Sequence, residues 1–342
     1  MTNPRRRINV ISLDFDGCIF NRGYIYSFSP NRLIEHNQKF IDSVTSHLVL
    51  EAIQEAVLMV GSNRQDVWSD IENSRGKSGS CYPALLQLSE TFAAKPELKD
   101  VYVHHNDFLM ADIYGSRNHG ESFQAAMMDE PGHFHFQWLF DSSKLTTLYA
   151  QMHKLASENP DAEIIFDFYD DRLDLLAPLS TFFKNNSDLV PDNLQLRLHE
   201  YEGEGIRDFA PIQGTLPADK NYQNNIWRMI VCAGLDYDAF MLNPTECDVM
   251  SGLTPDRLQS FKENRDKPYT PPVLTHAGGS VFQHRLEQEE YDPVFILEAV
   301  LGYVLDALDA ISNMRLWSLF SRQKTEAPAV SESATPVSNM TI

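Results

Sequence analysis

Short apolar runs alternate with amphipathic stretches along the first two thirds of the chain. Four runs have the length and composition of buried strands, at residues 10–13, 56–60, 163–169 and 194–199. Four stretches carry apolar residues at helical spacing, at residues 31–53, 141–158, 173–183 and 225–233. A strand, a helix and a second strand in succession form a βαβ unit, and such units build parallel sheets. The pattern therefore predicts an α/β fold with a parallel sheet flanked by helices.

The alternation is interrupted after the second run. Residues 64–140 contain a helical pattern at 80–92 and strand-like patterns at 101–104 and 108–114, but also a glycine-rich stretch without periodicity. We expect these residues to form a cap inserted into the core. The expected organisation is a core at residues 1–63 and 141–235, a cap at 64–140, a helical C-terminal region at 236–320 and a disordered polar tail at 321–342.

Acidic side chains follow two of the predicted strands at the point where each strand ends. Asp14 and Asp16 follow the first run, and because residues i and i+2 of a strand share a face, both should point into the same space. Asp170 and Asp171 follow the third run. Carboxylates forced together repel each other unless a cation lies between them. Hard oxygen ligands suit Mg²⁺, so the pattern predicts a magnesium site.

Two polar residues and one lysine complete the candidate set. Ser62 and Asn63 follow the second predicted strand, at the end of the sheet where open α/β folds bind ligands. The Ser62 hydroxyl suits a phosphate oxygen, although an ordinary turn serine would look the same. Lys144 falls in the first turn of a predicted helix, where the helix dipole does not stabilise a cation. Its position favours a role in a site.

The order of these residues resembles the four motifs of the haloacid dehalogenase (HAD) superfamily of phosphohydrolases. The motifs correspond to Asp14-x-Asp16-Gly17, Ser62, Lys144 and Asp170-Asp171. The segments GSNRQ, FLMADIYG, FDSSKLTTLYAQMHKLA and IIFDFYDDRLDLL are similar to HAD-type effector proteins that Legionella-like intracellular bacteria secrete into host cells. The resemblance covers roughly residues 8–230 and implies a HAD-type Rossmann-like core. Some members of that group resemble phosphotyrosine phosphatases.

The resemblance also implies roles for the acidic residues. Asp14 would attack phosphorus and form an aspartyl-phosphate, which splits one difficult step into two. Asp16 would act first as general acid and then as general base. Mg²⁺ would be held by the Asp14 carboxylate, the Asp16 backbone carbonyl and Asp170. Asp171 would either orient the lysine or reach a metal-bound water.

The remaining residues would bind the substrate. Ser62, Asn63 and Lys144 would hold the phosphoryl oxygens, and Lys144 would also neutralise charge in the transition state. The implied substrate is a phosphorylated one, a phosphotyrosine-like phosphoprotein or a small phosphomonoester. One alternative is a phosphatase for a small metabolite or nucleotide. Another is a catalytically idle HAD scaffold that binds a host protein or membrane through residues 236–320.

The insertion between the second and third motifs resembles the C2 placement of HAD caps. Its aromatic side chains would either stack on an aryl phosphate or form the core of the cap. These side chains are Tyr82, Phe108, Tyr114, Phe134, Phe136 and Trp138.

Charge and targeting signals narrow the possible partners. The formal net charge of −20 argues against nucleic acid and anionic membrane as default partners. The first apolar run is too short for a secretory signal, and no apolar stretch is long enough to cross a membrane. Together with the resemblance, this predicts a protein of the bacterial cytoplasm that is then translocated into the host cell.

A long amphipathic pattern follows at residues 292–320. Asp292 and Pro293 have the order of a helix cap and first-turn proline, and apolar residues recur at spacings of three and four. This apolar face would either pack on the rest of the C-terminal region or dock on a host membrane or protein. Acids on its polar face weaken the membrane alternative, because helices on membrane surfaces usually carry Lys and Arg there.

Overall fold

A computed structural model describes residues 5–27, 32–65, 70, 79–114, 118–127, 141–234 and 247–270. Residues Met1–Pro272 form one compact unit. The long helix predicted at 292–320 and the polar tail predicted at 321–342 lie outside the described residues. The same holds for three of the aromatic candidates, Phe134, Phe136 and Trp138.

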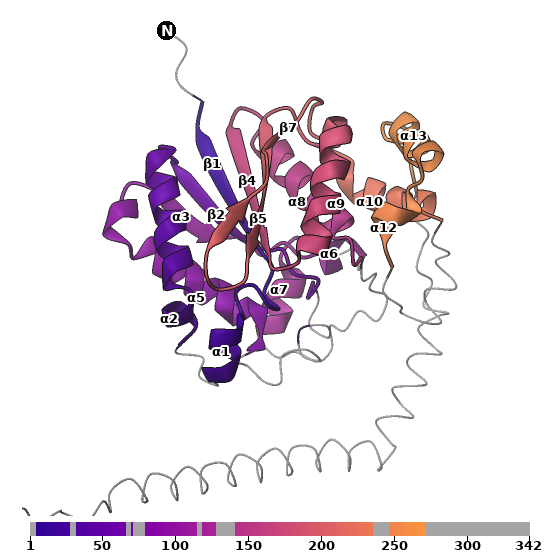
Figure 1. Ribbon diagram of the computed structural model, residues 1–342. Helices are drawn as coiled ribbons and strands as arrows, with labels where there is room; N and C mark the ends of the chain where they lie inside the picture. Colours follow the sequence, from indigo (N-terminus) through magenta and orange to yellow (C-terminus); the bar gives the residue numbers. More distant parts are fainter. Residues whose placement is uncertain are drawn as a thin grey trace, which may run out of the picture. The chain divides into compact units, whose positions relative to one another are not determined.

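A seven-stranded sheet forms the centre of the described chain (Figure 1). Its strands are β1 (Arg7–Leu13), β2 (Glu55–Val60), β3 (Tyr102–His105), β4 (Glu163–Asp170), β5 (Leu194–Tyr201), β6 (Ile206–Asp208) and β7 (Ile212–Gln213). The order across the sheet is β3-β2-β1-β4-β5-β6, and β7 also pairs with β5. The first five strands run parallel, whereas β6 and β7 are antiparallel to β5. The predicted α/β fold is confirmed in this mostly parallel, Rossmann-compatible form.

The central strand β1 marks the point where the strand order reverses. The chain proceeds from β1 to β2 and β3 on one side, and β4 and β5 follow on the other side. In open α/β sheets, ligands bind outside the carboxyl ends of the strands at such a switch point. The carboxyl ends of β1 and β4 are therefore the first place to look for a site.

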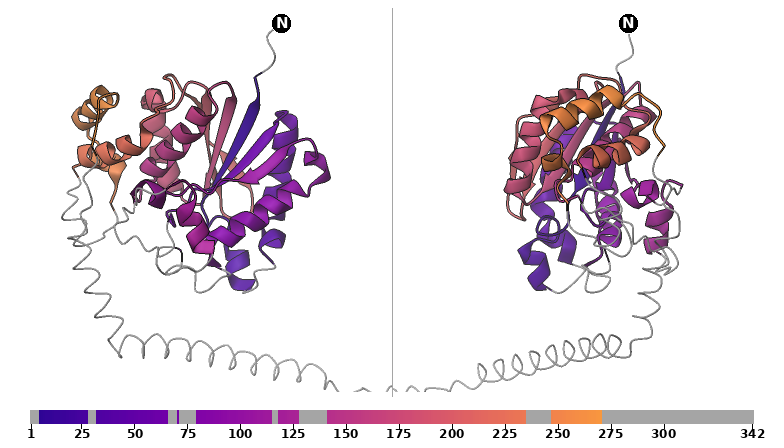
Figure 2. Two further views of the ribbon diagram at one scale, coloured as in Figure 1. Left: turned by 180° about the vertical axis from the view of Figure 1, so that it is seen from behind. Right: turned by 90° about the vertical axis from the view of Figure 1, so that its right-hand side faces the viewer.

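Helices cover both faces of this sheet (Figure 2). They are α1 (Arg22–Ser27), α2 (Leu33–His36), α3 (Gln38–Leu50), α5 (Cys81–Ala93), α6 (Met110–Tyr114), α7 (Glu121–Met127), α8 (Leu145–Glu158), α9 (Leu173–Asn185), α10 (Tyr222–Cys232), α12 (Val249–Gly252) and α13 (Pro255–Asn264). Apolar side chains of α3 and α5 join Ile11 and Leu13 of β1 in one core cluster. Ser12 points to the opposite face, where it donates a hydrogen bond of 2.8 Å to Gln151 of α8.

The helix predicted at residues 31–53 is divided into α2 and α3. The division occurs at Asn37, whose side-chain amide donates to the backbone carbonyls of Ile19 at 3.0 Å and Leu33 at 2.9 Å. Asn37 has φ −112° and ψ +14°, which departs from helical geometry, although its N–H still donates to the Leu33 carbonyl at 3.2 Å. The helical pattern was correct, but the tertiary contact interrupts it.

The boundary predicted for the cap is wrong at its N-terminal side. Helix α5 packs on β2 and β3, and β3 pairs with β2 in parallel register from Glu55 opposite Tyr102 to Leu58 opposite His105. Both elements therefore belong to the core sheet. The strand predicted at 108–114 is also wrong, because helix α6 occupies residues 110–114. Its Asp112 carboxylate accepts the N–H groups of Gly120 at 2.9 Å and Ser122 at 3.0 Å, which folds the segment back on itself.

The described part of the C-terminal region contains α12 and α13. Helix α13 packs on α10, and its Lys262 donates a hydrogen bond of 2.8 Å to Asp188 of the core. Residues 247–270 thus pack with the core, although we expected a separate region from residue 236. Within the described ranges, every helix is too short or too polar to cross a membrane.

Candidate active site

Asp14 lies directly after the last residue of β1. Its N–H donates to the Tyr169 carbonyl at 2.9 Å, which continues the pairing of β1 with β4 by one residue. The Asp14 side chain is buried, and its Oδ1 accepts a hydrogen bond of 2.7 Å from Lys144 Nζ. The sheet itself therefore fixes the position of this carboxylate.

Asp170 and Asp171 complete an acidic cluster at the end of β4. Asp170 is fully buried, and its two oxygens accept from the Arg172 N–H at 2.9 Å and from Lys144 Nζ at 2.6 Å. One carboxylate oxygen from each of Asp14, Asp170 and Asp171 lies within 4.8 Å of the others. This group could hold a metal ion, as predicted for three of the four acids.

The backbone before α8 directs Lys144 into this cluster. Lys144 has φ +55° and ψ +9°, a left-handed conformation that is uncommon outside glycine. Asp141 holds the turn in place, since its carbonyl accepts the Lys144 N–H at 2.9 Å and its carboxylate accepts the Thr146 N–H at 3.0 Å. The N-cap of α8 is Lys144 itself, and the Asp141 carboxylate supports the first turn of the helix from three residues earlier. The turn orients a buried lysine toward two carboxylates.

Burial and neighbouring charges shift the pKa values of Asp14, Lys144 and Asp171. Burial raises the pKa of Asp14 to about 7; the Lys144 charge opposes this rise, and Asp170 adds to it. Burial alone would lower the pKa of Lys144, but Asp14 and Asp170 outweigh it and raise that pKa above its usual range. Partial burial and the neighbouring Asp170 raise the pKa of Asp171. Three carboxylates share one lysine, so a further cation would relieve the remaining repulsion.

Gly17 permits Asp171 to approach. Its φ is +80°, and a Cβ atom built on residue 17 would lie 2.1 Å from Asp171 Oδ2. Any side chain at this position would displace the carboxylate, and the left-handed backbone would be strained as well. Residue 17 of the first motif therefore has to be glycine, because its backbone is left-handed and Asp171 leaves no room for a Cβ atom.

The Asp16 side chain does not join the cluster, contrary to the prediction. β1 ends at Leu13, so the rule that alternate strand residues share a face does not extend to Asp14 and Asp16. The Asp16 carboxylate instead forms a bidentate pair with Arg64, with 2.8 Å between Asp16 Oδ2 and Arg64 Nε. The side chain of Asp16 is 58% exposed, whereas Asp14 is buried.

Ser62 and Asn63 lie on the loop after β2, beside the end of β1. The loop is held there by Gly61, whose N–H donates to the Leu13 carbonyl at 2.7 Å. The Ser62 hydroxyl is buried and accepts the Arg64 N–H at 3.4 Å, and the Asn63 side chain is half-buried. Both residues are at the predicted end of the sheet. Their described hydrogen bonds stay within the loop and do not reach the acidic cluster.

The sequence analysis missed two residues of this loop. Gln65 is buried and donates to the carbonyls of Val60 at 2.6 Å and Ser62 at 2.7 Å, which closes the loop into a tight turn. Arg64 is buried and pairs with Asp16. The signal available in the sequence was the segment GSNRQ, in which Arg64 and Gln65 follow two and three residues after the strand-end Ser62.

The aromatic candidates that the structure describes are core residues. Tyr82, Phe108 and Tyr114 are each at most 2% exposed. The Tyr82 ring lies 5.2 Å from Phe123, and the Tyr114 ring lies 4.9 Å from Trp227. These three side chains therefore pack in the interior instead of facing a substrate.

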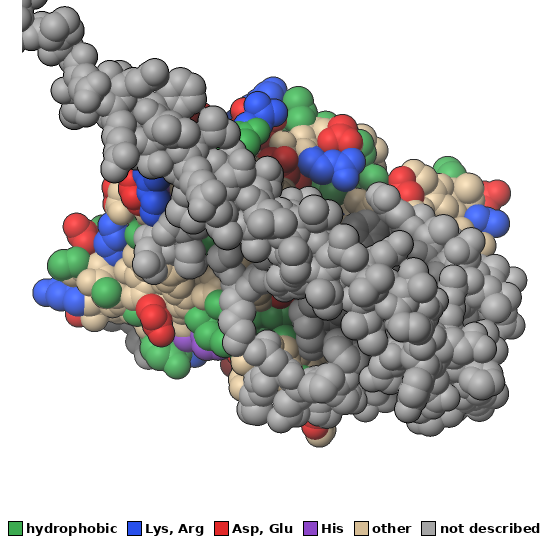
Figure 3. All heavy atoms as spheres, turned by 90° about the horizontal axis from the view of Figure 1, so that it is seen from below, with side chains coloured by type: hydrophobic (Ala, Val, Ile, Leu, Met, Phe, Trp, Pro, Cys, Tyr) green, Lys and Arg blue, Asp and Glu red, His purple; other side chains and the backbone are tan. Residues whose placement is uncertain are grey.

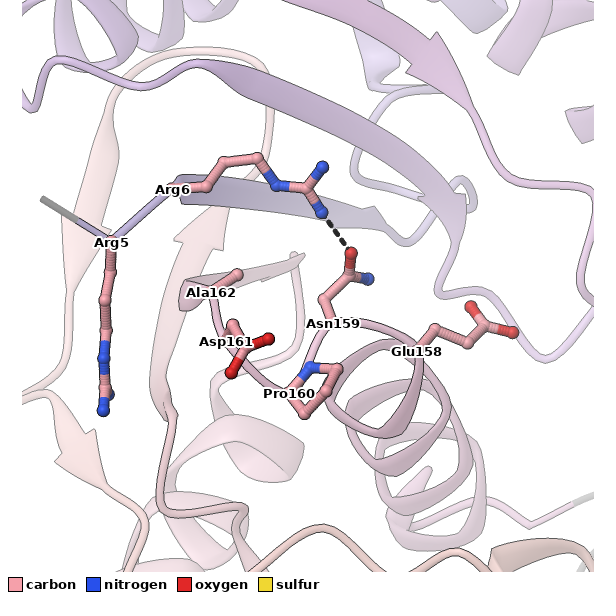
Figure 4. Close-up of a pocket in the computed structure, with 7 residues that line it drawn as sticks. All are labelled: Arg5, Arg6, Glu158, Asn159, Pro160, Asp161 and Ala162. Carbon is pink, nitrogen blue, oxygen red and sulfur yellow. Dashed lines mark hydrogen bonds between the residues drawn. The ribbon is translucent and has the colours of Figure 1, made fainter. Parts of the chain in front are cut away.

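The described side chains that are visible at the end of the molecule carrying the cluster are of mixed type (Figure 3). Figure 3 views the molecule from the side toward which β1 points in Figure 1, and described side chains of both charges are interspersed there with apolar ones. A hollow of about 530 Å³ lies elsewhere, at the amino ends of β1 and β4 (Figure 4). There Arg6 donates to Asn159, and the lining contains two arginines and two acids, Glu158 and Asp161. This open, charge-balanced hollow contains none of the candidate residues.

Comparison of the chain with protein-family models, with curated proteins and with solved structures found no match. The geometry of the site therefore has to support any functional conclusion by itself.

Proposed function

We propose that the chain is a Mg²⁺-dependent phosphomonoester hydrolase that works through an aspartyl-phosphate, as the resemblance to the HAD superfamily implies. The observation that carries this proposal is the meeting of Asp14, Lys144 and Asp170 at the carboxyl ends of β1 and β4. Distant segments bring these buried groups to the place where open α/β sheets bind ligands. Burial and the neighbouring Asp170 raise the pKa of Asp14 despite the lysine, and such perturbed groups cluster at functional sites.

The proposed reaction begins at Asp14. One of its oxygens forms a bond to phosphorus while the bond from phosphorus to the leaving oxygen breaks, and Asp16 supplies a proton to that oxygen. In the second step, water transfers a proton to Asp16 while its oxygen bonds to phosphorus. The Asp14 carboxylate is thereby released, together with hydrogen phosphate. The exposed position of Asp16 suits a group that has to meet both a leaving group and water.

Lys144, Ser62 and Asn63 would bind the phosphoryl group. Lys144 is held within 2.7 Å of Asp14, so its charge lies beside the oxygen that attacks. A preorganised cation at this point stabilises the charge that develops in the transition state. Ser62 and Asn63 are on the neighbouring loop and would donate to the remaining phosphoryl oxygens.

The Asp14, Asp170 and Asp171 carboxylates and the Asp16 backbone carbonyl would hold the metal ion. The fit is supported by their hard oxygen donors and by the repulsion that a single lysine leaves among three carboxylates. When bound, Mg²⁺ neutralises charge, so that an anionic nucleophile and an anionic substrate can approach each other. The Asp16 side chain is kept outside this ligand set because it pairs with Arg64.

The proposed substrate is a phosphotyrosine-like monoester. This part of the proposal rests on the resemblance alone. A small-metabolite or nucleotide phosphatase is the alternative within the same chemistry. Because α5 and β3 belong to the core, the proposed C2-type cap is restricted to the parts of residues 64–140 outside these two elements, of which residues 106–140 are the longest. Because Tyr82, Phe108 and Tyr114 are buried, stacking on an aryl group is proposed for the other candidates, Phe134, Phe136 and Trp138.

The resemblance further implies an effector that is translocated from the bacterial cytoplasm into a host cell. A host protein or membrane would be contacted through the C-terminal region at residues 236–320. Because residues 247–270 pack with the core, this contact is proposed for residues 271–320. The alternative that is not an enzyme is a catalytically idle HAD scaffold, which would make the same contact with a host protein or membrane.

Turnover of p-nitrophenyl phosphate, with Mg²⁺ and with EDTA, tests the proposal. We expect turnover that requires Mg²⁺ and a phosphorylated Asp14 that can be trapped by acid quench and located by mass spectrometry. The absence of both in the folded chain would contradict the enzyme and favour the scaffold. A panel of phosphopeptides, phosphosugars and nucleotides then identifies the substrate class.

A further inference from the structure

A buried arginine, Arg64, pairs with the exposed Asp16 carboxylate. The Arg64 side chain is 6% exposed, and its guanidinium donates to the Gly79 carbonyl at 2.5 Å and lies 5.7 Å from the centre of the Phe20 ring. The Arg64 backbone is also held, because its carbonyl accepts the Tyr82 hydroxyl at 3.0 Å. These contacts position the arginine independently of Asp16.

The fork of this guanidinium determines where the Asp16 carboxylate points. Nε donates to Oδ2 at 2.8 Å, and a terminal nitrogen donates to Oδ1. Such a bidentate pair fixes both the position and the plane of a carboxylate, which a single lysine contact would not do. An exposed aspartate without this partner would sample several rotamers.

The pairing suits one of the two steps proposed for Asp16. Guanidinium offers only donors, and both Asp16 oxygens accept from it, which is the arrangement of a carboxylate and not of an acid. In the hydrolytic step the carboxylate accepts a proton from water as the water oxygen bonds to phosphorus and the bond from phosphorus to Asp14 breaks. The products are hydrogen phosphate, the Asp14 carboxylate and protonated Asp16.

We propose that Arg64 is a positioning residue that holds the Asp16 carboxylate for hydrolysis of the aspartyl-phosphate. The inference rests on the proposed function, and it adds a residue that none of the four motifs contains. Arg64 acts through Asp16 and does not touch the substrate. Its loss therefore slows the second step and leaves the first step unchanged when the leaving group needs no proton.

The test is the division of the effect between kcat and KM, measured with p-nitrophenyl phosphate and Mg²⁺. Since p-nitrophenolate leaves without a proton, kcat/KM reports the transfer to Asp14 and kcat reports hydrolysis once hydrolysis is slow. In Arg64→Met we expect kcat and KM to fall together by about 100-fold, the size of a general-base contribution. We also expect a burst of about one p-nitrophenol per enzyme, followed by slow turnover.

Three other results would overturn the inference. If Arg64 contacts the phosphoryl group itself, KM rises and kcat/KM falls. If Arg64 only supports the fold, kcat falls with the fraction of active protein while KM stays constant and no burst appears. Unchanged kinetics would equally contradict it.

Matched variants connect the effect to Asp16. In an Asp16→Asn background, Arg64→Met should cause no further loss, because the group that it positions is already gone. Arg32→Met is the control, since Arg32 forms a similar bidentate pair with Glu35 on the surface, at 2.9 and 3.0 Å. We expect wild-type kinetics from this control. A full additional loss in the Asp16→Asn background would show that Arg64 acts elsewhere.

The outcomes separate this inference from the proposed function. A folded wild-type chain without Mg²⁺-dependent turnover and without phosphorylated Asp14 contradicts the function, and the inference with it. An active wild type with an unaltered Arg64→Met variant contradicts the inference alone. If Arg64→Met does not fold, Arg64→Lys keeps the buried charge but not the fork, and the same joint fall of kcat and KM is expected at a smaller size.

Discussion

Gly17 and Asp171 approach each other so closely that no side chain fits between them. A Cβ atom at residue 17 would lie 2.1 Å from Asp171 Oδ2, and the backbone there has φ +80°. The loop after β1 and the end of β4 are thus in contact through a glycine and a carboxylate of the acidic cluster. The position of Asp171 depends on this absence of a side chain.

We predict that Gly17→Ala displaces the Asp171 carboxylate and weakens the metal site. The Mg²⁺ concentration that gives half-maximal activity should rise about tenfold or more, as for other changes that reorient metal ligands. A Mg²⁺ titration of activity measures this shift. Gly205→Ala is the matched control, because no atom lies within 4 Å of a Cβ atom there. An unchanged titration in Gly17→Ala would contradict a metal role for Asp171.

Replacement of the proposed nucleophile should separate activity from stability. We expect Asp14→Asn to lower kcat/KM for p-nitrophenyl phosphate by about 10,000-fold or more, as in other enzymes that lose their nucleophile. The melting temperature without Mg²⁺ should hold or rise. Burial raises the pKa of Asp14 to about 7, so the folded chain holds this group more easily uncharged. Substantial turnover in the purified variant would refute the assignment.

Lys144→Met should reduce both activity and stability. The substitution leaves Asp14 and Asp170 buried without their shared cation, which costs about 3 kcal/mol of unfolding free energy when Mg²⁺ is absent. Added Mg²⁺ should restore part of this loss, and kcat should fall about 100-fold. Urea unfolding with and without Mg²⁺ measures the first effect. Lys39→Met is the control, because the Lys39 pair with Glu204 is exposed, and it should change neither quantity.

A histidine in α8 should make the chain less stable in mild acid. Burial lowers the pKa of His153 from its usual 6.5 to about 4, and the neutral ring accepts the Asp219 N–H at 2.9 Å. The unfolded chain takes up a proton near pH 6.5, whereas the folded chain does so only near pH 4. The contribution of His153 is therefore complete above pH 6.5 and is lost as the pH falls toward 4.

The expected loss is on the order of 3 kcal/mol between these two pH values. We predict that His153→Gln, which cannot be protonated, reduces the difference between unfolding free energies measured at pH 7 and pH 5. The variant should be less stable than the wild type at pH 7 and closer to it at pH 5. An equal pH dependence in both proteins would mean that His153 is not the responsible group.

Truncation should show where the folded unit ends. Residues 247–250 contact the turn before Lys144, since the Val249 N–H donates to Asp141 at 3.2 Å and the Met250 N–H donates to Ser143 at 3.3 Å. We expect a fragment of residues 1–235 to melt about 10 °C lower than the full chain and to lose activity. A fragment of residues 1–272 should match the full chain in both. Equal behaviour of the two fragments would contradict the packing of α12 and α13.

Local pattern was sufficient for four of the seven strands and for part of the candidate site. Apolar runs located β1, β2, β4 and β5, and the parallel βαβ rule predicted that their carboxyl ends meet. This placed Asp14 and Asp170 together, and Lys144 was added by its position at a helix start and by the resemblance. It succeeded because each of these residues lies directly at the end of a strand or the start of a helix, where the backbone direction is set by the element itself.

Tertiary structure alone decided the rest. β3 was misassigned to a cap because a four-residue strand has too short a pattern to reveal its partner, and only its pairing with β2 identifies it. The divergence of Asp16 from Asp14 depends on a turn beyond the strand, where strand periodicity no longer applies. Its partner Arg64 comes from another loop, and the contact of Gly17 with Asp171 likewise joins two loops. Such contacts leave no periodic trace in a single sequence, because they depend on how separate strand ends are brought together by the sheet.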